Sequence, residues 1–182
     1  MNMRDDPDFF VLFHAPESVL DARIKTRAVC PLCQNSRNLT LNPTKFVGYD
    51  EATKEYFLMC DNKDCLGFGK ERMGPKEGDN LGIEAIRDRL EMDQQVIDKA
   101  FTLQGVPKVY LNNAVPADKA KGLVDDYEIT PEFSHFKKED GAIGVKENSW
   151  VVKDNDGTDS FSVMPATIVL SLISQIYNLL FS

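Results

Sequence analysis

The four cysteines of this chain all fall within one stretch of 36 residues, and they are arranged as two short pairs. Cys30 and Cys33 form a C-x2-C pair, and Cys60 and Cys65 form a C-x4-C pair after 26 intervening residues. Each short spacing lets one tight turn aim two thiolates at a common point, about 2.3 Å from a tetrahedral zinc ion. The pattern therefore predicts a structural zinc ribbon in which all four cysteines bind one Zn²⁺.

Disulfides, an iron–sulfur cluster and a redox pair are the other uses of four cysteines. The first eight residues are polar and acidic, so we expect no secretory signal and a reducing, cytoplasmic location, which disfavours disulfides. A thioredoxin-type C-x-x-C needs no second pair, and iron–sulfur clusters usually use a tighter run of three cysteines. Zinc is favoured, while a cluster and a disulfide stay open as alternatives.

A site of four thiolates is closed to substrate, because it leaves no open position for water or a reacting group. The two histidines, His14 and His135, lie far from both cysteine pairs in the sequence, and we expect them to be ordinary surface or core residues. The metal is therefore expected to be structural and not catalytic.

Two stretches between the cysteine pairs, Leu39–Leu41 and Lys54–Met59, have the composition of strands. Turn-forming residues at 42–43 and 48–53 separate them. A module this small cannot bury enough apolar surface to fold alone, so the metal must contribute about 10 kcal/mol to its folding. We expect it to be disordered without zinc.

The residues around the cysteines resemble the four-cysteine finger of the Ogr/Delta family of phage late-transcription activators. The resemblance rests on Cys30-Pro-Leu-Cys33-Gln, Lys54-Glu-Tyr56, Cys60-Asp-Asn62-Lys-Asp-Cys65 and Phe68. The C-x4-C with an internal asparagine is also similar to ribbons of topoisomerases and primases. The similarity covers residues 30–68, about a fifth of the chain, with a slightly longer central loop and no match after residue 72. It implies that the ribbon contacts DNA and RNA polymerase.

Positive charge is concentrated around the cysteines. Residues 22–76 carry ten Lys and Arg against six acidic residues, whereas residues 1–21 sum to −4 and residues 77–182 to −8. A basic module can track phosphates locally, although the total of −8 argues against strong sequence-independent binding. Simple solvation of a small ribbon is the alternative account of these charges. The candidate nucleic-acid-binding residues are Arg23, Lys25, Arg27, Arg37, Lys45 and Lys63.

A glycine- and proline-containing stretch at 73–80 marks a change from the ribbon to helical periodicity. The predicted domains are an N-terminal segment at 1–21, the zinc ribbon at 22–76 and an α+β domain at 77–182. The first contains the apolar run Phe9–Phe13, which is an added strand or a docking peptide, and we expect it to pack on the α+β domain. Residues 18–23 are expected to form a helical turn that leads into a strand at 24–29.

The expected fold class is α+β, with an N-terminal zinc ribbon followed by a small α+β domain. We expect one or two helices between an N-cap at Asp79 or Asn80 and a stop at Gly105. The segments after this helix are predicted as a strand at 106–111, a turn at 112–116, a short helix at 117–124, a hairpin of 149–153 with 160–163, and an apolar helix at 165–182. That last helix is uncharged, too short to cross a bilayer and without basic flanks, so we expect no membrane insertion.

The sequence favours a non-enzymatic function, because no nucleophile, base and orienting group stand at motif spacing. The first hypothesis is a zinc-ribbon protein associated with nucleic acid or the transcription machinery. The alternative is a structural or adaptor subunit in which the ribbon is a protein-binding knuckle. The apolar C-terminal helix is expected to pack on the hairpin region 145–163, or to pair with a protein partner or a second copy of the chain.

Overall fold

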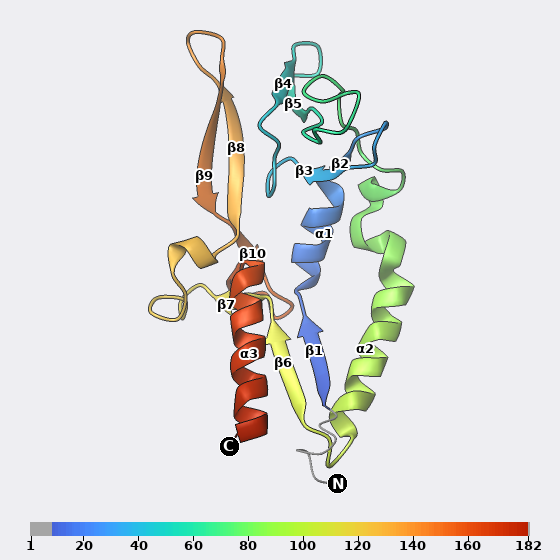
Figure 1. Ribbon diagram of the computed structural model, residues 1–182, viewed down its shortest axis with the longest axis vertical. Helices are drawn as coiled ribbons and strands as arrows, with labels where there is room; N and C mark the ends of the chain where they lie inside the picture. The colour runs from blue at the N-terminus through green and yellow to red at the C-terminus, as the bar shows by residue number, and fades with distance from the viewer. Residues whose placement is uncertain (1–8, 182) are drawn as a thin grey trace. The chain divides into compact units, whose positions relative to one another are not determined.

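The computed structural model describes residues 9–181 and has the predicted α+β fold (Figure 1). Among the described residues the strands form five small sheets, four of two strands and one of three. The helices are α1 (Glu17–Lys25), the 3-10 helix η1 (Asp79–Ile86), α2 (Arg87–Thr102), the 3-10 helix η2 (Asp126–Glu128) and α3 (Pro165–Phe181).

The chain divides into two compact units, each made of segments that are not contiguous in the sequence. The ribbon unit comprises Leu20–Ala85 and Pro131–Trp150. The second unit comprises Met1–Val19, Ile86–Thr130 and Val151–Ser182, of which residues 1–8 and 182 lie outside the described part. The predicted domain boundaries at 1–21, 22–76 and 77–182 stay predictions.

Two antiparallel strand pairs form the ribbon itself. The first pairs β2 (Arg27–Val29) with β3 (Ser36–Asn38), and the second pairs β4 (Val47–Asp50) with β5 (Glu55–Leu58). The strand predicted at 54–59 is confirmed by β5. The strand predicted at 39–41 is wrong, because the strand comes earlier, at 36–38, where the chain leaves the first cysteine turn and returns along β2. The strand predicted at 24–29 is shorter, since residue 24 lies in α1.

The segment predicted as a turn at 48–53 is partly a strand, because a turn at residues 51–54 is enough to reverse the chain. The Asp50 carboxylate accepts the backbone N–H of Ala52 at 3.0 Å, and Lys54 N–H donates to the Asp50 carbonyl at 2.8 Å. Lys54 takes a positive φ of 62° to complete this turn. Val47–Asp50 is then free to pair with β5, and the lack of a side chain at Gly48 lets the Phe57 ring lie against it.

A hairpin that was not predicted from the sequence completes the ribbon unit. Its strands, β8 (Pro131–Lys137) and β9 (Ile143–Ser149), pair in register from Pro131 with Ser149 to Lys137 with Ile143. The hairpin joins the cysteine-containing part of the unit through a backbone hydrogen bond from Phe133 N–H to the Thr40 carbonyl, at 2.6 Å.

The second unit contains a parallel pair and a three-stranded sheet. The pair consists of β1 (Phe10–His14) and β6 (Lys108–Asn112), so the apolar run near the N-terminus is a strand and the predicted strand at 106–111 is confirmed. The sheet has the order β10 (Val151–Lys153), β11 (Asp159–Ser162), β7 (Ala114–Pro116). The predicted hairpin of β10 and β11 is therefore confirmed. The turn predicted at 112–116 is partly the strand β7, and the helix predicted at 117–124 is a series of turns.

The helical segment after residue 79 is interrupted at Gly82. There η1 bends with φ +58°, and a side chain at this position would overlap the carboxylate of Asp21, which accepts the backbone N–H of Ile83 at 3.1 Å. The regular helix α2 therefore begins only at Arg87, and neither predicted N-cap residue caps it. Asp79 is instead buried in an ion pair with Arg27.

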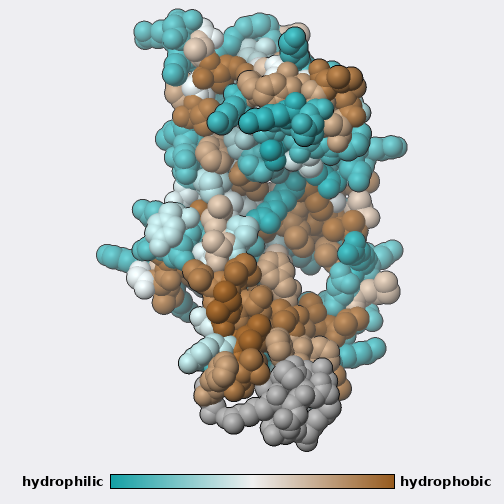
Figure 2. Space-filling model, viewed as in Figure 1, coloured by the Kyte–Doolittle hydropathy of each residue, from teal (hydrophilic) through white to brown (hydrophobic). Residues whose placement is uncertain are grey.

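The uncharged C-terminal helix is present as α3, but its main neighbour is β6 and not the predicted hairpin region (Figure 1). The Gln175 side chain accepts the backbone N–H of Tyr110 at 3.1 Å and donates to its carbonyl at 2.8 Å. No described helix is both long enough and apolar enough to cross a membrane. Figure 2 shows apolar side chains gathered over α3 and β6, and the exposed ones on α3 are Val169, Leu170, Ile173, Tyr177 and Phe181.

Candidate metal centre

The four cysteine sulfurs converge in the ribbon unit, where all of them lie within 4.8 Å of one another. The Sγ atoms of Cys30 and Cys65 are 3.9 Å apart, and those of Cys33 and Cys60 are 3.6 Å apart. Four sulfurs at tetrahedral positions about 2.3 Å from one ion would be separated by about 3.8 Å. No disulfide joins them. The four cysteines are thus positioned to bind a metal ion, and each short contact connects the first pair to the second.

The first cysteine pair lies on a tight turn between β2 and β3. Gln34 N–H donates to the Cys30 carbonyl, and Cys30 N–H donates to the Asn35 carbonyl, both at 2.9 Å. Gln34 takes a positive φ of 60°, which closes the turn and sends the chain back along β2. The C-x2-C spacing therefore aims both sulfurs to one side, as the sequence predicted.

The second cysteine pair lies on a longer turn after β5. Cys65 N–H donates to the Asn62 carbonyl at 3.0 Å, and Gly69 N–H donates to the Cys60 carbonyl at 2.7 Å. Gly67 N–H points at the Cys65 sulfur, 3.4 Å away. This hydrogen bond favours a negatively charged sulfur, but burial and the neighbouring thiols of Cys33 and Cys30 outweigh it, so the pKa of the Cys65 thiol lies above its ordinary value.

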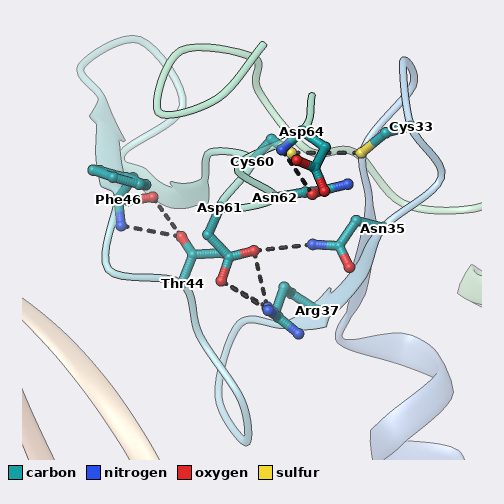
Figure 3. Close-up of polar contacts among 9 residues, drawn as sticks. All are labelled: Cys33, Asn35, Arg37, Thr44, Phe46, Cys60, Asp61, Asn62 and Asp64. Atoms are coloured by element: carbon teal, nitrogen blue, oxygen red, sulfur yellow. Dashed lines mark hydrogen bonds and ion pairs between the residues drawn. The ribbon is translucent and has the colours of Figure 1, made fainter. Parts of the chain in front are cut away.

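Asp61 connects the two turns directly (Figure 3). Its carboxylate accepts the Asn35 side-chain amide at 2.9 Å and the Arg37 Nε at 3.0 and 3.1 Å. Arg37 Nη2 adds an ion pair at 2.9 Å. Because Asp61 follows Cys60 and its partners follow Cys33, this network holds together the two backbone turns that carry the sulfurs. Asp61 was not predicted from the sequence, and no spacing rule marks it.

The electrostatics of the sulfurs differ from one cysteine to the next. A hydrogen bond from the Asn35 backbone N–H lowers the pKa of the Cys33 thiol to about 7. Burial raises the pKa of the Cys60 thiol to about 12. Without a metal, Cys60 therefore keeps its proton at neutral pH, and a metal ion must displace that proton in order to bind.

The site is closed on its inner side by apolar packing. Cys30 and Cys60 have no exposed surface, and they form one cluster with Cys65, Leu58 and Met73. A tetrahedral ion at their centre would have no free coordination position, which suits a structural role better than a catalytic one.

The six basic residues predicted to bind nucleic acid separate into two groups. Lys25 pairs with Asp21 at 2.8 Å, Arg27 binds Asp79 and Arg37 binds Asp61. The other three are exposed and have no ion pair within the part of the chain that the structure describes, namely Arg23, Lys45 and Lys63. The charge count of the sequence could not distinguish cations used inside the fold from those available to a partner.

Neither histidine belongs to the sulfur cluster. His14 Nδ1 lies 3.2 Å from the Asn112 side-chain oxygen, and the His135 ring packs on Tyr56 with a centroid distance of 5.6 Å. Within residues 9–181, the four cysteines are the one group of His, Cys, Asp or Glu side chains found close enough together to hold a metal ion. Comparison of the chain with protein-family models, with curated proteins and with solved structures finds no match.

Proposed function

We propose that the four cysteines hold one structural Zn²⁺ and that the ribbon ordered by this ion contacts nucleic acid or the transcription machinery. The observation that carries the proposal is the sulfur cluster, whose two closest distances of 3.6 and 3.9 Å fit one tetrahedral ion. Zinc is the structural metal that four thiolates in a tetrahedron most commonly bind, and an iron–sulfur cluster is the competing occupant.

The exposed charge of the ribbon supports nucleic acid as the partner. Lys45, Lys54, Lys63 and Lys70 are exposed, and no ion pair engages them within the described residues. Residues 22–76 sum to +4, and binding Zn²⁺ to four thiolates leaves +2. The ribbon therefore has unpaired positive side chains that are available to phosphates, although the rest of the chain is acidic.

The test measures binding of the full-length, zinc-loaded protein to labelled single- and double-stranded nucleic acid over a range of salt concentrations. We expect affinity to fall steeply with salt, and Lys45→Gln with Lys63→Gln to reduce the logarithmic salt slope by about one per lysine that contacts a phosphate. Lys121→Gln, at an exposed position of the second unit, is the matched control. If the wild-type protein binds no nucleic acid even at low salt, the adaptor hypothesis replaces this one.

The exposed apolar face of α3 supports a second candidate function, self-association or binding of a protein partner. Val169, Ile173 and Tyr177 are spaced four residues apart on this uncharged helix, and each is more than half exposed. Light scattering after size exclusion should show a dimer that Ile173→Lys converts to a monomer. A wild-type monomer at all concentrations would reject self-association.

A further inference from the structure

A pocket of about 780 Å³ opens within the ribbon unit. Its walls come from β2, β5, the segment 72–75 and β8, and no cysteine lines it. The volume falls in the range of sites that hold small molecules or single chemical groups of a larger ligand. Leu58 and Met73 belong both to this lining and to the apolar cluster around the cysteines, so the pocket is a second feature of this unit that adjoins the metal centre.

One side chain in the pocket wall has a buried polar atom without a partner. His135 Nε2 is inaccessible to solvent and makes no hydrogen bond to the described residues. Burial lowers the pKa of this imidazole, so the ring is neutral at pH 7, and Nε2 can still form one hydrogen bond. Buried polar atoms in native proteins are nearly always satisfied, so a ligand that draws the His135 ring toward the pocket would supply the missing partner.

The same strand offers an aromatic surface beside this atom. Phe133 and His135 are two residues apart on β8, so their side chains leave the same face of the strand, and both line the pocket. The His135 ring is backed by Tyr56, whereas no aromatic ring contact engages Phe133 among the described residues. A flat ring lying on Phe133 would bring its polar edge toward His135.

The pocket also offers one cation that the fold does not use. Four cationic side chains line it against two acidic ones, Glu55 and Glu132. Lys25, Arg27 and Arg72 are held by ion pairs with Asp21, Asp79 and Asp50, respectively. Lys54 is an exposed residue and has no ion pair among residues 9–181, so it is available to an anion. A ligand that joins a flat polar ring to an anionic group meets all three features.

We propose that this pocket binds one unpaired nucleotide of a single-stranded nucleic acid, with the base stacked on Phe133, its polar edge bonded to His135 and its phosphate near Lys54. This inference rests on the proposed nucleic-acid function and deepens it, because it assigns the single strand as the preferred form. A base paired in a duplex cannot enter, since its polar edge and both faces are already occupied.

The test uses the full-length, zinc-loaded protein and a single-stranded oligonucleotide that carries one 2-aminopurine, a base whose fluorescence changes when it stacks. We expect quenching on binding and none with the matching duplex. Phe133→Leu should abolish the quenching and weaken binding at least fivefold, about the loss of one weak base stack. His135→Phe keeps a ring against Tyr56 but removes Nε2, and should also weaken binding.

Phe136→Leu is the matched control, because Phe136 lies on the opposite face of the same strand and outside the pocket lining. Salt-dependent binding without quenching, and with equal affinity for Phe133→Leu, would overturn the pocket proposal and leave the proposed function standing. A histidine NMR titration with adenosine monophosphate gives the separate readout. A shift of the His135 signals with no binding of any strand would support the pocket as a nucleotide site and reject the nucleic-acid function.

Discussion

Replacing Asp61 with alanine tests whether the two cysteine turns are held together by the network around that carboxylate. The variant loses hydrogen bonds from Asn35 and Arg37 together with an ion pair. Hydrogen bonds to a charged group contribute about 1.5–3 kcal/mol each when well shielded. The side chains of Arg37 and Asp61 are 30% and 20% exposed, so water competes and we expect a total loss of about 2 kcal/mol.

That loss should appear as weaker metal binding, because the ion binds the folded ribbon. A difference of about 2 kcal/mol corresponds to roughly a 30-fold increase in the zinc Kd. Competition with a chromophoric chelator at pH 7 measures this Kd directly. Asp64→Ala is the control, since Asp64 is exposed in the same turn and its removal changes the charge equally. Equal zinc affinity for the wild type and Asp61→Ala would refute the role given to the network.

Three further predictions concern the ribbon unit. Arg27→Ala should lower the free energy of unfolding at pH 7 by about 2 kcal/mol, because it leaves the buried carboxylate of Asp79 unpaired. This loss is smaller than that for a fully buried ion pair because Arg27 is partly exposed. Arg27 holds the pKa of Asp79 below its ordinary value, so the pair stabilises the fold above about pH 4 and the difference from wild type should vanish in urea titrations as pH falls through the lowered pKa. Gly82→Ala should cost about 1–2 kcal/mol in the same assay, because φ is +58° and the new methyl group would overlap Asp21; a neutral result would contradict the bend seen at η1. The zinc Kd should rise at least tenfold from pH 7 to pH 6, since the metal displaces at least the Cys60 proton, and a pH-independent Kd would contradict thiolate ligation.

The features predicted correctly from the sequence are those that short-range geometry determines. The C-x2-C and C-x4-C spacings require tight turns, so the convergence of the sulfurs follows from the spacing of the cysteines alone. The Asp-Gly turn between β10 and β11 and the uncharged run of α3 carry equally local signals. In each case the signal lies within short stretches of consecutive residues.

The features that were missed depend on residues far apart in the chain. β1 pairs with β6, and its partner residues lie 98 positions away, which periodicity cannot reveal. In the β8–β9 hairpin neither face of the strands is consistently apolar. The sequence therefore lacks the alternation of apolar and polar residues that indicates a strand, and it resembles that of a loop. Asp61 and Arg37 are ordinary charged residues in the sequence, and only their position beside the cysteine turns gives them a role.

The most direct test of the account is native mass spectrometry of the purified, reduced protein before and after chelation, with hydrogen exchange followed in the same samples. We expect one zinc ion per chain, no visible absorption from an iron–sulfur cluster, and rapid exchange of the amides in residues 27–74 once the ion is removed. A chain free of metal whose ribbon amides stay protected would contradict the claim that four cysteines and one ion hold this module together.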